Sequence, residues 1–257
     1  MRTILSWLYL ILAFGFIYLP VVVLVLYSFQ ESGLPVPPFD GPSLKWYDDV
    51  LGDSDVTDAL THSLLVAVGS SVVAVILGFL AAYGLARYTF SGSPFVRLLL
   101  IAPLTVSYLI VGLGLLIVLT RVGLGLSLVT AGIGHVVINL PLAFAIIFAS
   151  MNARQENAER AARDLGATEM RVIFFVTAPM LVPAIAAAFF LSVTLSWDEF
   201  IISFLLTRFD ITLPVEIWSM LRSGLSPRLN AIGSVVFLIS VAVVLILEFT
   251  VLRKRHL

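Results

Sequence analysis

The stretch "NAERAARDLGATEMR", Asn157 to Arg171, lies between two long hydrophobic runs and is nearly half charged. Four small or apolar residues recur at i, i+3, i+4 and i+7, the spacing of one helix face: Ala158, Ala161, Ala162 and Leu165. Gly166 follows at once, where helices often end in a left-handed residue. Thr168 can then cap a new helix that begins at Glu169. The stretch predicts a short charged helix, a glycine hinge and a return into a hydrophobic segment.

The composition around this stretch is that of an integral membrane protein. The chain has 257 residues, of which 60% are hydrophobic and only 12% are charged, whereas a soluble domain has about 25% charged residues. The mean hydropathy is +1.08. The net charge of -1 argues against a nucleic-acid partner. The absence of cysteine excludes disulfides, thiolate metal sites and a cysteine nucleophile.

Charge-free runs predict the membrane spans, because a helix needs about 20 apolar residues to cross a bilayer. We expect an all-α integral membrane protein with one domain, residues 1–257, and an outer loop at about 30–60. A cytoplasmic loop is expected at about 152–171. The six expected spans lie at about 4–29, 62–86, 98–120, 125–150, 173–197 and 230–252. The first run is too long for a signal peptide and lacks a small-x-small cleavage site, so it is expected to stay as a span.

The distribution of lysine and arginine predicts the orientation. With six spans both termini lie on one side, and that side carries ten of the fifteen basic residues: Arg2, Arg87, Arg97, Arg154, Arg160, Arg163, Arg171, Arg253, Lys254 and Arg255. The other side carries five: Lys45, Arg121, Arg208, Arg222 and Arg228. We therefore expect both termini and the charged helix in the cytoplasm.

Two interpretations of the charged helix follow from its alanine-rich face. The helix could lie among lipid headgroups, or it could insert into a groove of a partner protein. Small side chains bury little area in lipid but allow close packing between helices. The composition of the face therefore favours the groove.

The same stretch resembles the EAA loop, the cytoplasmic signature of permease subunits of ABC importers. In "AARDLGATEMRVIFFVTAPMLVPAI", Ala161 and Ala162 match the motif alanines, Gly166 its glycine and Pro179 its proline. Arg160 occupies the glutamate position, and a glutamate stands one place earlier. Further stretches, "KWYDDVL", "RYTFSGSPFV" and "LPVEIWSMLRSGLSPRLNAI", are most similar to the second permease subunit of spermidine/putrescine importers.

This resemblance implies a type I ABC importer permease of the MetI-like fold in the inner membrane. It implies a heterodimer with a second permease subunit, two ATPase subunits that carry ATP and Mg²⁺, and a periplasmic substrate-binding protein. The chain itself would hold no cofactor. The charged helix would be the coupling helix that docks on the ATPase, through Glu159, Arg160, Ala161, Ala162, Asp164, Leu165, Gly166 and Ala167.

No catalytic machinery is visible in the sequence, so an enzyme activity of this chain alone is not expected. The phosphate-binding pattern GxxxxGK[ST] is absent. His62, His135 and His256 are too scattered for a metal site. His135 falls in an expected span, where an ionisable residue is a functional candidate, but a neutral histidine bonded within the bundle is the favoured interpretation.

Asp198 and Glu199 are the main candidates for a substrate path. They stand between the apolar runs "AAAFFLSVTLSW" and "FIISFLLT", where carboxylates are costly unless they meet water, a cation or a partner. They are either a cation-attracting site or an interfacial pair. Trp197 and Trp46 could stack on an aliphatic amine or lie in the aromatic belt. The expected path is completed by Ser196 and by Tyr108, which stands where polyamine-type permeases can place an acidic residue.

The expected function is half of the translocation path for a small cationic solute, in particular a polyamine. Other small solutes stay open, namely an amino-acid derivative, an opine or an organophosphonate. A secondary transporter would need coupling-ion residues in the spans, for which only His135, Glu248 and the Asp198–Glu199 pair are available. A non-transporting assembly or sensor protein is disfavoured because no soluble signalling domain is visible.

Overall fold

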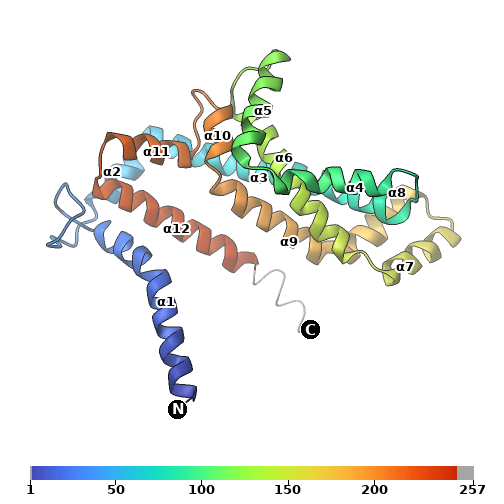
Figure 1. Ribbon diagram of the computed structural model, residues 1–257, viewed down its shortest axis with the longest axis horizontal. Helices are drawn as coiled ribbons and strands as arrows, with labels where there is room; N and C mark the ends of the chain where they lie inside the picture. The colour runs from blue at the N-terminus through green and yellow to red at the C-terminus, as the bar shows by residue number, and fades with distance from the viewer. Residues whose placement is uncertain (1, 248–257) are drawn as a thin grey trace. The chain divides into compact units, whose positions relative to one another are not determined.

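The computed structural model describes residues 2–247, and every regular element among them is a helix. The expected all-α class is therefore confirmed. The end of the expected sixth span lies outside the described residues, as do five residues used in the sequence analysis: Glu248, Arg253, Lys254, Arg255 and His256. The chain divides into two compact units, and Figure 1 labels the helices of both.

The first unit comprises Met1–Leu60 and Val215–Ala242. Its helices are α1 (Arg2–Tyr27), α2 (Lys45–Gly52), most of α11 (Leu213–Ser223) and most of α12 (Pro227–Leu247). Arg228, near the start of α12, lies with its Nε 3.3 Å from Oδ2 of Asp49 and is also paired with Asp53. The hydrogen bond from Arg228 lowers the pKa of the Asp53 carboxyl. These ion pairs tie the expected outer loop to the last helix.

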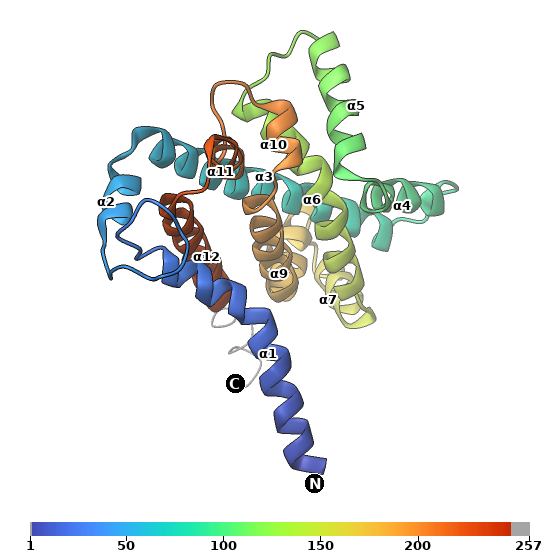
Figure 2. The same cartoon turned by 60° about the vertical axis from the view of Figure 1, so that its left-hand side comes forward.

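The second unit comprises Thr61–Pro214 and Val243–Leu257. Its helices are most of α3 (Ser54–Arg87), α4 (Ser93–Ile101), η1 (Ala102–Thr105), α5 (Tyr108–Arg121), α6 (Leu128–Ser150), α7 (Ala153–Asp164), α8 (Glu169–Val172), the π-helical η2 (Ile173–Thr177), α9 (Ala178–Trp197) and α10 (Ile201–Leu206). α5 and α10 lie at the opposite end of α6 from α7 (Figures 1 and 2).

The core of the second unit forms where α6 packs against α3, α9 and α10. One cluster joins α3, α6 and α9: Val75, Phe79, Ala82, Ala143, Phe144, Ile147, Leu181 and Ala188. A second cluster joins α5, α6 and α10: Leu119, Ala131, Ile138, Ile202 and Leu206. Gly78 lets α3 approach α6 closely, because a Cβ at this position would lie 2.8 Å from the backbone nitrogen of Phe144.

Within residues 2–247, five helices are long and apolar enough to cross a membrane. The count becomes six if Ser93–Thr105 and Tyr108–Arg121 form one broken span, and these two helices are bent by 109°. The charge-free run predicts one continuous span at 98–120. The chain breaks instead after η1, where Val106 is extended at φ -102° and ψ 138°. Pro103 lies within the preceding turn and cannot donate a backbone hydrogen bond.

The close approach at Gly78 generates a prediction about stability. Gly78→Ala adds a methyl group against the backbone of α6, so the helices must move apart. We expect the free energy of unfolding to fall by about 1–3 kcal/mol, measured as a lower Tm of the detergent-purified protein.

Gly84→Ala is the matched control on the same helix, because nothing lies within 4 Å of the added Cβ. Alanine has the higher helix propensity, so this variant should keep or raise the Tm. Equal melting temperatures for the two variants would contradict the packing described for α3 and α6.

Candidate functional site

The charged helix of the sequence analysis is α7, and its two ends are fixed by local hydrogen bonds. It begins earlier than the alanine pattern indicates, because Asn152 and Gln155 form a capping box. The backbone N–H of Gln155 donates to Oδ1 of Asn152 at 3.2 Å, and the N–H of Asn152 donates to Oε1 of Gln155 at 3.1 Å. The predicted left-handed hinge is confirmed, since Gly166 has φ +85°.

The hinge after α7 has the hydrogen bonds of a Schellman motif. The N–H of Ala167 donates to the carbonyl oxygen of Ala162 at 3.0 Å, and the N–H of Gly166 donates to that of Arg163 at 2.9 Å. The carbonyl groups at the end of α7 are therefore satisfied without a side chain. The next helix, α8, starts at the predicted Glu169, although the Thr168 side chain makes no capping hydrogen bond.

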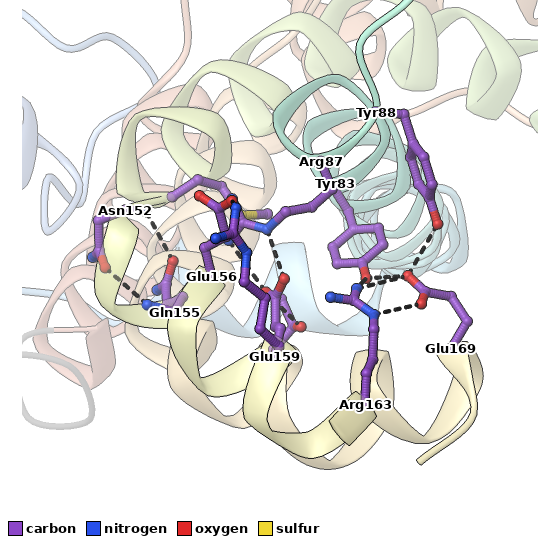
Figure 3. Close-up of polar contacts among 12 residues, drawn as sticks. Tyr83, Arg87, Tyr88, Asn152, Gln155, Glu156, Glu159, Arg163 and Glu169 are labelled. Atoms are coloured by element: carbon purple, nitrogen blue, oxygen red, sulfur yellow. Dashed lines mark hydrogen bonds and ion pairs between the residues drawn. The ribbon is translucent and has the colours of Figure 1, made fainter. Parts of the chain in front are cut away.

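The inner face of α7 carries a fully buried carboxylate. Glu159 has no exposed area and pairs with Arg87 at the end of α3, whose side chain is 8% exposed. Nε of Arg87 donates to Oε2 of Glu159 at 2.6 Å, and Nη2 donates to Oε1 at 3.2 Å. Thr177, the last residue of η2, donates its hydroxyl to Oε1 at 2.9 Å. The pair is visible in Figure 3.

A second polar cluster lies one helical turn further along α7. Arg163 binds Glu169 with two nitrogens, Nε to Oε2 at 3.0 Å and Nη2 to Oε1 at 3.1 Å. Tyr83 of α3 accepts a 2.9 Å hydrogen bond from Nη2 of Arg163 and donates to Glu169. Tyr88 donates to the same carboxylate at 3.0 Å (Figure 3). The hydrogen bond to Glu169 raises the pKa of both Arg163 and Tyr88 above their ordinary values.

The outer face of α7 is open. Arg160, which replaces the motif glutamate, is exposed and paired with Glu156 one turn earlier. Leu165 is 89% exposed. The residues expected to couple to an ATPase therefore divide into three groups: Glu159 is buried, Ala162 and Ala167 are half-buried, and Arg160, Ala161, Asp164, Leu165 and Gly166 are exposed. The predicted alanine face is split between the two sides of the helix.

The second part of the candidate site is the break between α9 and α10, where Asp198 and Glu199 have different environments. Glu199 is 6% exposed, and its carboxylate accepts hydrogen bonds from the N–H groups of Ile201 at 3.1 Å and Ile202 at 2.7 Å. It thus caps the first turn of α10. Of the two carboxylates, Asp198 alone is exposed.

His135 of α6 bridges the same break from inside the unit. It is 1% exposed; its Nδ1 is hydrogen-bonded to Ser196 at the end of α9 and its Nε2 to Ser203 of α10 at 3.0 Å. Oγ of Ser196 also lies 3.3 Å from Oγ of Ser70 on α3. The interpretation of His135 as a histidine bonded within the bundle is confirmed. These contacts keep the Ser196 hydroxyl inside the unit, where the residue is 4% exposed.

The aromatic candidates lie in separate surroundings. Trp197 is buried, with 7% exposure, and Tyr108 packs against the cluster that joins α5, α6 and α10. Trp46 belongs to the first unit, where its indole donates to the carbonyl oxygen of Gln30 at 2.6 Å and Nζ of Lys45 lies 5.0 Å from the ring. Among the described residues no group of histidine and acidic side chains could hold a metal ion.

Sequence reasoning missed Arg87, Tyr83, Tyr88 and Thr177 as parts of this site. A signal was present for one of them, because Arg87 is the charged residue that ends an apolar span. It was used only to orient the chain. The tyrosines and the threonine carry no comparable signal, since aromatic and hydroxyl residues are common at the ends of membrane helices.

The fold is a bundle of apolar helices with one charged helix anchored at its end, the architecture that the sequence analysis expects of a membrane permease. Residues 74–256 match the family described as "binding-protein-dependent transport system inner membrane component", and the chain belongs to this family. The resemblance of the EAA loop to ABC importer permeases is thereby confirmed.

Named relatives extend the similarity over most of the chain. It is 30% identical over 234 residues to the spermidine/putrescine transport system permease protein PotC of Escherichia coli (strain K12), covering 90% of this chain and 88% of the relative. It is 34% identical over 235 residues to the putrescine transport system permease protein PotI of the same strain, covering 88% and 83%. PotC of Haemophilus influenzae is 27% identical over 250 residues, covering 96% of each chain.

Solved structures agree with the fold. A bacterial ABC transporter involved in the import of the acidic polysaccharide alginate has a chain that superposes with a TM-score of 0.69 at 17% identity, covering 98% of this chain and 95% of that chain. The same kind of transporter in complex with an alginate pentasaccharide-bound periplasmic protein gives a TM-score of 0.72 at 15% identity, covering 96% and 93%. At these identities the likeness shows a shared importer-permease fold.

Proposed function

We propose that this chain forms half of the translocation path of an ATP-driven importer for a small cationic solute of the polyamine class. The main support is the similarity, over about nine tenths of the chain, to permeases named for spermidine and putrescine transport. The other subunits would be a second permease, two ATPases and a periplasmic binding protein. ATP and Mg²⁺ would bind to the ATPases.

The break between α9 and α10 supports a cationic solute. Asp198 is exposed there, while the carboxylate of Glu199 accepts hydrogen bonds from backbone N–H groups. An ammonium group gains from a carboxylate in a partly dry path, where salt screens charges less than in bulk water. A groove of about 490 Å³ between α3 and α6 offers a cation little, because its lining is apolar apart from Ser70.

α7 is the element proposed to meet the ATPase. Its exposed tip combines an apolar side chain, Leu165, with charged ones, Arg160 and Asp164. A short helix with one protruding apolar anchor fits a groove on a partner protein. The inner face cannot take part directly, since Glu159 is buried against Arg87.

The proposed orientation places both termini in the cytoplasm and residues 31–60 outside, as the basic residues indicate. Ser54 and Ser91 are exposed and would lie on opposite sides of the membrane. A membrane-impermeant maleimide should label Ser54→Cys in intact cells and leave Ser91→Cys unlabelled. The reverse labelling pattern would invert the topology.

The role of Asp198 is tested by uptake. Asp198→Asn keeps the shape and removes the charge, so we expect the rate of spermidine and putrescine uptake to fall by about tenfold, the size of a hydrogen bond to a charged group. The measurement is radiolabelled uptake into proteoliposomes that contain the full complex. Uptake at the parent rate would exclude Asp198 from the path.

Glu199→Ala is the informative comparison, because it removes a cap and not a solute contact. It should lower the free energy of unfolding by about 0.5–2 kcal/mol, whereas Asp198→Asn should leave the Tm unchanged.

If the parent complex takes up a neutral amino acid and neither polyamine, the substrate class is wrong. The importer assignment would then still rest on coupled ATP hydrolysis.

Docking through the tip of α7 predicts a separate defect. Leu165→Asp puts a charge where an apolar anchor is proposed, so the ATPase should no longer co-purify with the permease. Leu51→Asp is the control, because Leu51 is also exposed but lies on α2, in the expected outer loop. Undiminished ATPase recovery with Leu165→Asp would return α7 to the membrane-surface interpretation.

A further inference from the structure

Two side-chain contacts, Arg87–Glu159 and Tyr83–Arg163, connect α3 to α7 and repeat at the same spacing on both helices. We call each contact a rung. Tyr83 and Arg87 are i and i+4 on α3, and Glu159 and Arg163 are i and i+4 on α7, so each pair lies on one helix face. Arg87 binds Glu159, and Tyr83 binds Arg163 (Figure 3). Two contacts one turn apart restrict both the position and the rotation of α7 on α3.

The first rung is sealed from water. Glu159 has no exposed area, and both of its oxygens accept hydrogen bonds from within the chain. One of these comes from Thr177, so the carboxylate joins α7 to α3 and to the segment that leads into α9. A buried charge pair tolerates little misalignment, because each partner depends on the other for its lost hydration. The rung therefore holds one geometry.

The chain enters and leaves α7 through two turns. Before α7 the chain passes through Met151, which is extended at φ -70° and ψ 128°. After α7 it passes through Gly166, whose left-handed backbone lacks the restraint of a Cβ. Arg163 and Glu169 bind each other across that hinge. The side-chain contacts add to the hydrogen bonds that close the two turns.

We propose that Arg87 is a positioning residue for energy coupling: through Glu159 it makes α7 and the membrane helix α3 move as one body when an ATPase displaces α7. This inference rests on the proposed docking of α7 on an ATPase. α3 is long and apolar enough to span the membrane, and it packs against α6 and α9 in the core of its unit. Displacement of α7 thus reaches the bundle through α3 as well as along the chain into α9.

A purely structural role for Arg87 makes a different prediction. If the ion pair only helped the chain to fold, its loss would lower the Tm and the amount of complex, and each assembled complex would still transport. If the pair transmits movement, the assembled complex should hydrolyse ATP without matching transport. The decisive quantity is the number of spermidine molecules imported per ATP hydrolysed.

The test uses the full complex in proteoliposomes with spermidine-loaded binding protein. Arg87→Gln should leave ATPase co-purification intact and lower the transport-to-hydrolysis ratio by about fivefold or more, the lower range of coupling between sites. The double variant Arg87→Glu with Glu159→Arg restores an ion pair, and the Thr177 hydroxyl can accept from the new arginine. It should recover a substantial part of the ratio.

Arg97→Gln is the matched control, because Arg97 lies in α4 over the ring of Phe148, 4.7 Å from its centroid, and takes no part in either rung. Its ratio should equal that of the parent. Thr177→Val removes one hydrogen bond to Glu159 with little change of shape. If Arg87→Gln does not assemble, a lowered transport-to-hydrolysis ratio in Thr177→Val is the result that supports the positioning role.

Three results separate the possible failures. Unchanged ratios in Arg87→Gln or, where that variant does not assemble, in Thr177→Val would overturn the positioning role while the parent still couples. A lower Tm with an unchanged ratio would assign the pair to folding alone, which also overturns it. A parent complex that binds no ATPase would instead refute the proposed function on which this inference rests.

Discussion

A backbone that crosses a bilayer must satisfy its own hydrogen bonds, because hydrocarbon offers neither donors nor acceptors. In this protein the constraint matters most where helices end inside or beside the apolar part of the chain. Glu199 accepts from the first N–H groups of α10, and the Schellman bonds around Gly166 close α7. These two breaks are built from specific polar contacts, and the two candidate functional regions lie at them.

The same need to pair polar groups explains how a charged helix is kept on an apolar bundle. α7 turns Glu159 inward to a buried arginine and leaves Arg160 and Leu165 on its outer side. The inner contacts fix the position of the helix, and the outer side chains are exposed. A single twelve-residue helix thereby combines a buried anchoring side with an exposed side, which is the side proposed to meet the ATPase.

The break between α9 and α10 divides its carboxylates in the same manner. Asp198 and Glu199 are adjacent in sequence, yet one is exposed and the other is enclosed by the turn that it caps. His135 reinforces that turn by binding a serine on each side of it. In the proposed cation path, Asp198 would present one negative charge beside a turn that Glu199 and His135 hold.

Much of the fold follows from the sequence, because long charge-free runs leave an apolar helix as the stable choice in lipid. The alanine spacing and Gly166 likewise indicated α7 and its hinge, since helix periodicity and positive φ are local properties. The bend after Pro103 was not predicted, because prolines also occur in unbroken membrane helices. Only the tertiary structure decided that Glu159 meets Arg87, 72 residues away, and that Glu199 is a cap while Asp198 is free. Periodicity tells which residues share a helix face, but the neighbour that this face meets is decided by how the helices pack.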